Sequence, residues 1–379
     1  MKYDIAIVGG GMVGASFAAA LHNTSLRIAL IDAAPTHAND HRLIALNAAS
    51  CDFFKDLKLW PALALHTAAI QEVHVSTRGH FGTTRLTAQE MDVPQLGSVV
   101  PASEINHALY ARLDTLNNVD ILRGATLTTL LQTTSHVELT LQTESGQELI
   151  EANIVVGADG TFSTVRELLQ IPAETIDYQQ KALVTITELQ RSHHHIAYER
   201  FLKKGAIAML PLTGNRVATI WSGDEKEINE FLKLSDSDFL NTLQEQFGYR
   251  LGKLIKTHAR FSYPLKFIKA KENIKDRVIL IGNAAHTVHP IAAQGLNLAL
   301  FEVDILTKHF SQELSLKNLP DFFTQQTLSM HLSHRLTQLF SMDFLVVNAA
   351  RQLGMMGLDL CTFAKKRFGK RLLGQIKPM

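Results

Sequence analysis

Three glycines near the start of the chain have the spacing of a dinucleotide-binding turn. Gly9, Gly11 and Gly14 occupy the positions G-x-G-x-x-G, and Asp32 follows eighteen residues after Gly14. Glycines let the backbone approach a pyrophosphate at the positive end of a helix, and a carboxylate can accept hydrogen bonds from ribose hydroxyls. The motif predicts a dinucleotide site that Met12 and Val13 also touch. It fits NAD and FAD equally well, because both carry adenosine diphosphate.

Two later stretches have residues that could complete such a site. One runs Gly157-Ala158-Asp159-Gly160 and continues to Ser163 and Arg166; the other runs from Gly282-Asn283-Ala284-Ala285-His286 through Pro290 to Gln294-Gly295-Leu296-Asn297. Asp159 could also be a simple turn former. His286 and His289 lack the spacing of a helical zinc pair, so structural roles are favoured for both and no metal site is expected.

The elements that would position these residues can be read from apolar runs. Tyr3 to Val8 predicts a buried strand, Met12 to Leu21 a helix, and Arg27 to Ile31 a second strand, which together form a right-handed βαβ unit. Alternation from Ala182 to Trp221 predicts an antiparallel sheet, a candidate substrate domain. Arg277 to Ile281 predicts one more strand, followed by a long helical C-terminal region.

Composition narrows the class of protein. The chain has 379 residues, of which 46% are hydrophobic and 19% are charged, as expected for a globular fold. A formal net charge of +1 argues against nucleic acid as a partner. Cys51 and Cys361 lack the sequence spacing of a metal-ligand or redox pair. Two free thiols fit a reducing compartment, so a cytoplasmic location is expected. The run His193-His194-His195 is expected to be a solvated turn, and no membrane-spanning segment is predicted.

Taken in order, these motifs resemble the para-hydroxybenzoate hydroxylase superfamily of flavin monooxygenases, which use FAD. Within it, three further stretches are similar to the hydroxylases of ubiquinone biosynthesis: Arg78-Gly79-His80-Phe81-Gly82, Ala197-Tyr198-Glu199-Arg200-Phe201 and Met209-Leu210-Pro211-Leu212. Asn283 resembles the subgroup that acts on 2-polyprenyl-6-methoxyphenol.

The resemblance implies an α/β fold, α+β overall. A Rossmann-like FAD-binding domain is expected to be interleaved with an antiparallel-sheet substrate domain and followed by a helical C-terminal region. The expected FAD-binding segments are 1–69 and 101–175, the substrate segments are 70–100 and 176–270, and 271–379 holds the last FAD motif and the C-terminal helices.

The resemblance also implies roles for single residues. Asp159 would face the cofactor and a nicotinamide donor, Asn283 would bond the ribityl chain, and Arg42 would lie near the flavin and its phosphates, although Arg42 could instead be a surface residue. The isoalloxazine edge would meet Pro290 and the backbone of Gln294, Gly295, Leu296 and Asn297. The full cofactor set is Gly9, Gly11, Met12, Val13, Gly14, Asp32, Arg42, Asp159, Gly282, Asn283, Pro290, Gln294, Gly295, Leu296 and Asn297. Candidate substrate contacts are Arg78, His80, Phe201 and Pro211, of which Arg78 and His80 could merely organise a turn.

The implied activity is hydroxylation of a polyprenylated phenol in ubiquinone biosynthesis. NAD(P)H would reduce FAD, molecular oxygen would give a flavin hydroperoxide, and one oxygen atom would pass to the ring. No residue is identified as nucleophile or base. Ala293, Ala299 and Phe301 depart from the family pattern, as does Glu302 in place of a common aspartate. Two alternatives therefore stay open: a reductase or oxidase acting on another lipid-like substrate, and an inactive scaffold in a biosynthetic complex.

The C-terminal segment is locally basic. Lys365-Lys366-Arg367 and Lys370-Arg371 alternate with apolar residues. The pattern fits either a solvated helix end or a surface that meets anionic lipid or other ubiquinone-biosynthesis proteins. Peripheral contact with the inner face of the membrane would suit a polyprenylated substrate. The ring position, prenyl length, choice of NADH or NADPH and any homo-oligomer are left open.

Overall fold

The chain begins with the expected βαβ unit in the computed structural model, which describes residues 1–34, 40–80, 82–287, 294–317, 319, 357, 359 and 361–374. Strand β1 (Lys2–Val8) leads into α1 (Met12–Ala20) and then β2 (Ile28–Asp32). The two strands are parallel, with Ile5 opposite Ile28. Every residue of β2 is buried, which explains its uninterrupted apolar run.

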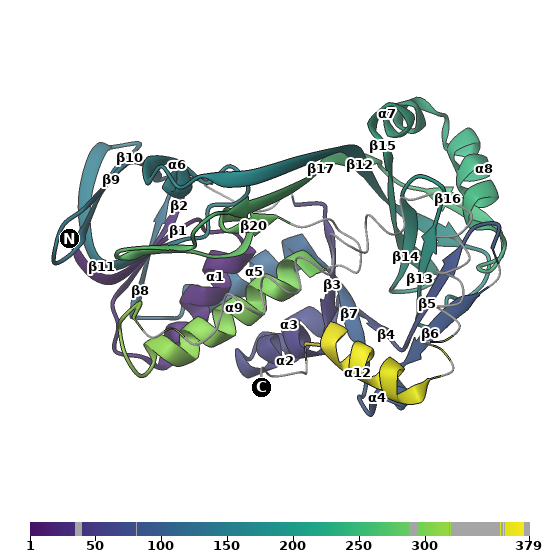
Figure 1. Ribbon diagram of the computed structural model, residues 1–379, viewed down its shortest axis with the longest axis horizontal. Helices are drawn as coiled ribbons and strands as arrows, with labels where there is room; N and C mark the ends of the chain where they lie inside the picture. The colour runs from purple at the N-terminus through teal and green to yellow at the C-terminus, as the bar shows by residue number, and fades with distance from the viewer. Residues whose placement is uncertain are drawn as a thin grey trace.

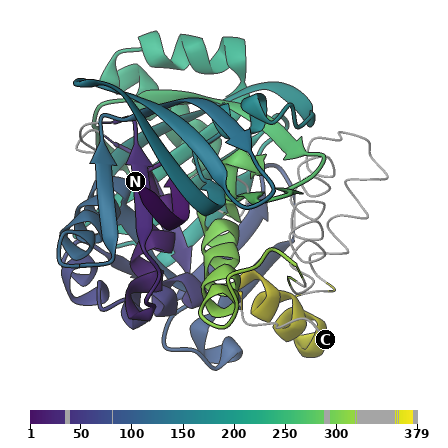
Figure 2. The same ribbon diagram turned by 90° about the vertical axis from the view of Figure 1, so that its left-hand side faces the viewer.

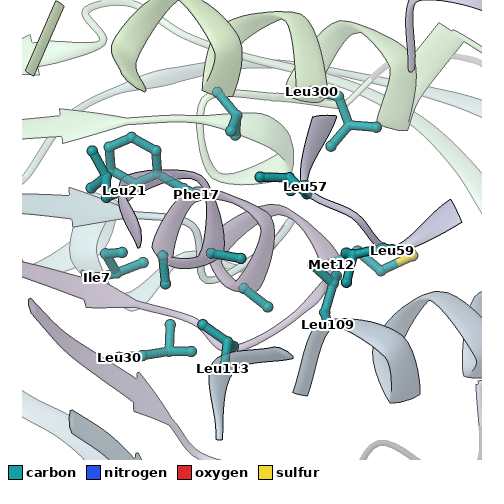
Figure 3. Packing of buried hydrophobic residues seen from close by; sticks show 14 of the residues in the cluster. Ile7, Met12, Phe17, Leu21, Leu30, Leu57, Leu59, Leu109, Leu113 and Leu300 are labelled. Atoms are coloured by element: carbon teal, nitrogen blue, oxygen red, sulfur yellow. The ribbon is translucent and has the colours of Figure 1, made fainter. Parts of the chain in front are cut away.

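The first large sheet extends this unit to eight strands. Its order is β18-β19-β11-β1-β2-β8, and the hairpin β9–β10 adds to β11. The added strands are β8 (Val119–Arg123), β9 (Thr126–Gln132), β10 (Val137–Thr143), β11 (Gly146–Gly157), β18 (Ile274–Lys275) and β19 (Val278–Leu280). Helix α1 packs against α5 (Ala102–Leu113) and α9 (Gln294–Phe310). Phe17, Leu109 and Leu300 share the resulting apolar cluster (Figure 3).

The second large sheet has nine strands in the order β20-β17-β12-β15-β14-β13-β5-β6, with β16 paired to β12. These strands are β5 (Glu72–Thr77), β6 (Thr83–Thr87), β12 (Ala173–Leu189), β13 (Ile196–Phe201), β14 (Ala206–Leu212), β15 (Arg216–Asp224), β16 (Leu254–Thr257), β17 (Phe261–Ala270) and β20 (His286–Thr287). The expected antiparallel pairing is correct except between β5 and β13, which are parallel. The exception arises because β5 enters the sheet from an earlier segment, not through a hairpin.

Helices α7 (Glu225–Lys233) and α8 (Asp236–Phe247) cover the outer face of this sheet and were not anticipated from sequence. Phe239 and Phe247 of α8 join Trp221 and Met209 in a separate core. A small third sheet contains β3 (Leu43–Asn47), β7 (Gly97–Pro101) and β4 (Ala68–Ile70). Around it lie α2 (Ala48–Asp56), α3 (Trp60–Ala64) and α4 (Ala88–Met91) (Figure 1).

Two long strands, β12 and β17, run along one side of the molecule between the large sheets (Figure 1). Ala270 at the end of β17 belongs to a core beneath the first sheet, whereas Leu183 of β12 belongs to the core of the second. Short α6 (Thr164–Leu168) follows β11, and α12 (Thr362–Leu372) packs on α4. Figure 2 shows α1 in purple beside α9 in green, and α12 in yellow. Within these described elements, no helix is long and apolar enough to cross a bilayer.

Candidate active site

A cavity of about 1770 Å³ is lined by the second large sheet, the small sheet, helices α1, α2, α9 and α12, and the turns that follow β1, β11 and β19 of the first sheet. Pockets for a single small molecule usually measure roughly 300–1,000 Å³, so this one has room for two ligands side by side. Of the residues expected to bind a cofactor, those that line it are Gly11, Met12, Val13, Arg42, Asp159, Asn283, Gln294, Gly295, Leu296 and Asn297. Gly9, Gly14, Asp32 and Gly282 lie behind this lining, and Pro290 lies outside the described residues.

The three glycines of the first turn are needed for different reasons. Gly9 has φ of +111°, and a Cβ there would lie 2.5 Å from the carbonyl oxygen of Ala158. A Cβ at Gly14 would lie 2.0 Å from the carbonyl oxygen of Gly9, so this glycine lets α1 pack against the turn. A Cβ at Gly11 would meet no protein atom within 4 Å. Gly9 and Gly14 are therefore required by the fold, while Gly11 borders open cavity space.

Asp32 is buried and already has protein partners. The Tyr110 hydroxyl lies 2.5 Å from its Oδ2, and the backbone N–H of Ala34 donates to its Oδ1 at 3.1 Å. Burial and the neighbouring Asp32 carboxylate raise the pKa of Tyr110, which keeps this hydroxyl a donor. Sequence reasoning missed Tyr110, because nothing in the spacing of a helical tyrosine 78 residues downstream signals such a contact. A ribose contact for Asp32 stays a prediction.

Asp159 has one carboxylate oxygen with a partner and one without. The N–H of Val165 donates to Oδ2 at 3.0 Å, whereas Oδ1 is buried with no hydrogen-bond partner in the part of the chain that the structure describes. Burial raises the pKa of this carboxyl against the opposing hydrogen bonds of Ser163 and the following backbone. Because a buried acceptor without a donor is costly, this oxygen fits a cofactor hydroxyl or amide in the cavity.

Arg166 joins the second and third motif stretches. Its Nη1 donates to the carbonyl oxygen of Ala284 at 2.8 Å, and its Nη2 donates to that of Thr161 at 2.9 Å. The N–H of Arg166 in turn donates to Ser163 Oγ at 3.0 Å, which caps α6. One guanidinium therefore fixes the position of the Asp159 turn relative to the loop that carries Asn283.

His286 and Glu302 form a buried hydrogen-bonded pair. Glu302 also accepts the N–H of Gly282 through Oε2 at 2.8 Å, so it ties the start of the Asn283 loop to α9. The acid at 302, which departs from the family pattern in sequence, is thus a structural support in this chain. His286 thus makes a structural contact, His289 lies outside the described residues, and the described residues contain no cluster of three or more metal-ligating side chains.

One side chain of the last cofactor motif is bonded to the small sheet, and Arg42 lies beside that sheet. Asn297 Nδ2 donates to the carbonyl oxygen of Ala45 at 2.9 Å, and Asn297 Oδ1 accepts the N–H of Asn47 at 2.9 Å. Arg42, just before β3, pairs with Asp40, and its Nε donates to Asp40 Oδ1 at 2.8 Å. These hydrogen bonds to Asp40 raise the pKa of Arg42, so the guanidinium stays protonated within an ion pair at the cavity edge.

The second sheet forms an apolar wall of the cavity, with Glu199 as its acid. Its apolar residues are Val73, Leu86, Ala182, Val184, Ala197, Ala206, Ala208, Leu210, Ile220 and Leu265, and Tyr198, Ser222, Tyr263 and Thr287 add hydroxyl groups. The four expected substrate residues are not part of the lining. Arg78 donates to Gln246 Oε1, His80 borders a separate pocket of about 250 Å³, Phe201 packs on Ala206, and Pro211 alternates with Leu210. Their contact with substrate stays a prediction.

Helix α12 closes another side of the cavity, which the sequence did not suggest. Its lining residues are Phe363, Ala364, Arg367, Phe368, Arg371 and Leu372. Lys365 holds the helix in place through Glu90 at 2.8 Å and Asp359 at 3.0 Å. The carbonyl oxygen of Leu373 accepts the N–H of Ala49 at 3.2 Å. The basic segment is therefore partly buried, neither wholly solvated nor wholly free.

The histidine run differs from the expected solvated turn at one residue. His193 is 5% exposed, and its Nε2 lies 2.9 Å from the carbonyl oxygens of both Leu212 and Gly214. His194 and His195 have φ of 50° and 60°, typical of a tight turn. The first imidazole therefore fixes the β12–β13 connection against the end of β14.

Comparison with known sequences identifies relatives along the whole chain. A family model described as "FAD binding domain" matches residues 2–317. "Ubiquinone hydroxylase UbiL" of Rhodospirillum rubrum is 31% identical over 99% of this chain and 90% of its own length. "3-demethoxyubiquinol 3-hydroxylase" of Escherichia coli is 29% identical over 80% of this chain and 78% of its own length.

Solved structures share the fold. The p-nitrophenol 4-monooxygenase PnpA from Pseudomonas putida superposes with a TM-score of 0.81 at 15% identity, covering 100% of both chains. The OxyS anhydrotetracycline hydroxylase from Streptomyces rimosus superposes with a TM-score of 0.76 at 19% identity, covering 100% of this chain and 78% of that one.

Proposed function

Because this chain belongs to the FAD binding domain family, we propose that its large cavity holds FAD along the three motif stretches and a phenol against the apolar sheet wall. The chain is an FAD-dependent hydroxylase of ubiquinone biosynthesis that uses a polyprenylated phenol, oxygen and, as is typical of the family, NAD(P)H. The interleaved division into cofactor and substrate segments is part of this proposal.

One observation supports the location of the site most directly. Gly11, Asp159, Asn283 and the first turn of α9, from segments far apart in sequence, line the same cavity as the alanine-rich face of the second sheet. The buried Asp159 oxygen without a donor and the open space at Gly11 both suit a polar cofactor. The departures at Ala299 and Phe301 leave the cavity open, so the scaffold alternative gains no support from geometry.

Bound FAD, once reduced, supplies the electrons and the oxygen chemistry; the chain supplies binding, orientation and exclusion of water. Asp159 and Asn283 would accept or donate hydrogen bonds to polar parts of the cofactor. Arg42 would offset its negative charge. The first turn of α9, beginning at Gln294, would place a positive helix end beside the ring system. The apolar wall would hold the phenol and the start of its prenyl tail.

The test uses purified full-length protein incubated with FAD, NAD(P)H and a phenol bearing a short prenyl chain. We expect flavin absorbance to be retained, NAD(P)H consumption to rise with the phenol, and one labelled oxygen atom from ¹⁸O₂ to appear in the product by mass spectrometry. NAD(P)H consumption without oxygen in the product would favour the reductase or oxidase alternative. Protein that fails to retain FAD would favour the scaffold.

We also propose peripheral contact with anionic membrane through α12. Phe363 is 76% exposed, and Arg367, Lys370 and Arg371 are exposed on the same helix. Cations beside an exposed aromatic ring suit a lipid surface, where a polyprenylated substrate resides. Sedimentation with vesicles containing anionic lipid should exceed that with neutral vesicles, and equal sedimentation would contradict the contact.

A further inference from the structure

The wall formed by the second sheet carries a single carboxylic acid. In the register of the sheet, Glu199 of β13 lies opposite Val75 of β5 and Ala208 of β14, and Ala208 lies opposite Ile220 of β15. Apart from Glu199, this row is apolar. Since alternate residues of a strand share a face, Ala197 lies on the same face of β13 and also lines the cavity. Glu199 therefore projects from an apolar surface into the part of the cavity proposed to hold the substrate.

The Glu199 carboxyl makes no hydrogen bond or ion pair with any residue that the structure describes. The Ser222 hydroxyl, which also lines the cavity, is already engaged with the backbone N–H and carbonyl oxygen of Ala206, at 3.0 and 3.2 Å. Burial raises the pKa of Glu199 to about 7. A carboxyl without a protein partner in such surroundings is suited to exchange a proton near neutral pH.

We propose that Glu199 is the catalytic base that accepts the proton of the substrate's phenolic hydroxyl. The assignment rests on the proposed hydroxylase function and adds to it the proton acceptor that sequence motifs did not identify. A phenol bound against the wall has one polar group to satisfy, and the wall offers one acid to receive it.

The proton transfer balances as follows. The phenol O–H bond breaks, the proton moves to a Glu199 oxygen, and the electron pair stays on the phenol oxygen and enters the ring. This pair makes one ring carbon nucleophilic, and that carbon forms the new C–O bond with oxygen derived from O₂ as the O–O bond breaks. The C–H bond at that carbon then breaks: its electron pair restores the aromatic ring, its proton passes to the departing second oxygen atom, and Glu199 returns its own proton to the phenol oxygen. The second oxygen atom leaves as water with electrons from NAD(P)H.

The strand residues beside Glu199 are uncharged, so its protonation can be followed in the pH dependence of kcat. Val75 and Ala208, which flank it from the adjacent strands, carry no charge. The charged groups that line other parts of the cavity include Arg42 and Asp159 from the cofactor side and Arg367 and Arg371 from α12. Substitution of one of these charged groups would move the midpoint of the pH dependence of kcat. Loss of the Glu199 carboxyl would instead remove the pH-dependent step itself.

The test compares wild type, Glu199→Gln and Glu199→Asp in the FAD-loaded enzyme, with Glu174→Gln on an exposed part of β12 as the matched control. General base catalysis usually contributes about 10²–10⁴-fold. We expect Glu199→Gln to lower kcat for hydroxylation at least about 100-fold, with FAD content unchanged. The wild-type rise of kcat through pH 7 should vanish in this variant, and Glu199→Asp should retain the rise with a lower plateau.

Two results would overturn the assignment: a Glu199→Gln variant with wild-type kcat, or one with reduced kcat and an unchanged pH profile. The second would mean that Glu199 only shapes the cavity. These outcomes are distinct from failure of the proposed function, in which the wild type itself would form no hydroxylated phenol. If Glu199→Gln does not retain FAD, the presence or loss of the rise in Glu199→Asp decides the question.

Discussion

The side-chain oxygen of Asn297 accepts a hydrogen bond from the backbone N–H of Asn47, 250 residues earlier in the chain, at 2.9 Å. The Asn297 side-chain amide also donates to the carbonyl oxygen of Ala45, two residues before Asn47. An asparagine side chain therefore pairs with β3 much as a neighbouring strand would. This contact fixes the first turn of α9 beside the segment that carries Arg42.

Replacing Asn297 with alanine should loosen this junction. The change leaves the N–H of Asn47 and the carbonyl of Ala45 without partners, which costs about 1–3 kcal/mol when such groups stay buried. We expect a lower free energy of unfolding in urea and weaker FAD binding by fluorescence titration. Asn241→Ala, at an exposed position of α8, should change neither quantity measurably. Equal stability of the two variants would mean that Asn297 does not anchor β3.

Gly11 and Gly14 should respond differently to alanine. Gly14→Ala places a methyl group against the carbonyl oxygen of Gly9, so α1 must shift, at a cost of roughly 1–3 kcal/mol or more. Gly11→Ala adds a methyl group to open space at φ of −66° and should change stability by less than about 1 kcal/mol. We nevertheless expect Gly11→Ala to weaken FAD binding at least tenfold. Unchanged affinity would place the cofactor elsewhere.

Arg166 should support both motif loops at once. Arg166→Gln removes the two hydrogen bonds to Thr161 and Ala284, and hydrogen bonds of charged groups contribute about 1.5–3 kcal/mol each. We expect a lower midpoint of thermal unfolding and reduced FAD affinity together. Arg191→Gln, exposed in the β12–β13 connection, is the control. A loss of stability without any change in FAD affinity would show that the loops keep their positions independently.

His74 should make the fold sensitive to mild acid. Burial, and then the charges of Arg250 and Arg85, lower its pKa to about 4 from an ordinary 6.5. Between these values the unfolded chain binds a proton that the folded chain does not, so stability falls as pH falls from 6.5 to 4. The loss approaches about 3 kcal/mol at the lower end.

The measurement is urea unfolding across this pH range for wild type and His74→Phe, which keeps an aromatic ring beside Tyr198. The variant should lose less stability than wild type as the pH falls. His107→Gln, on an exposed position of α5, should follow the wild-type curve. Parallel curves for wild type and His74→Phe would show that this imidazole does not resist protonation.

Local patterns were enough to predict the βαβ unit and the cofactor motifs, because turns and buried strands impose their own residue types. The residues of the second sheet that line the cavity were harder to predict from the sequence. The stretches at 197–201 and 209–212, which resemble the family, lie on the adjacent strands β13 and β14, but Phe201 and Pro211 are not part of the cavity lining, whereas Glu199 and Leu210 are. Pro211 alternates with Leu210 and so lies on the opposite face of β14, whereas Phe201 shares the face of Glu199 but packs with Ala206 and Val75. Partners such as Tyr110 and Glu302 depend on tertiary contact alone.

The long strands β12 and β17 have a consequence for how the molecule unfolds. Both are strands of the second sheet, yet the end of β17 at Ala270 packs into the core of the first sheet, so that core cannot open without disturbing a strand of the second. Interleaved chain order thus yields a single cooperative unit, although the two cores are separate. In calorimetry, heat denaturation should follow one endotherm whose van't Hoff and calorimetric enthalpies agree.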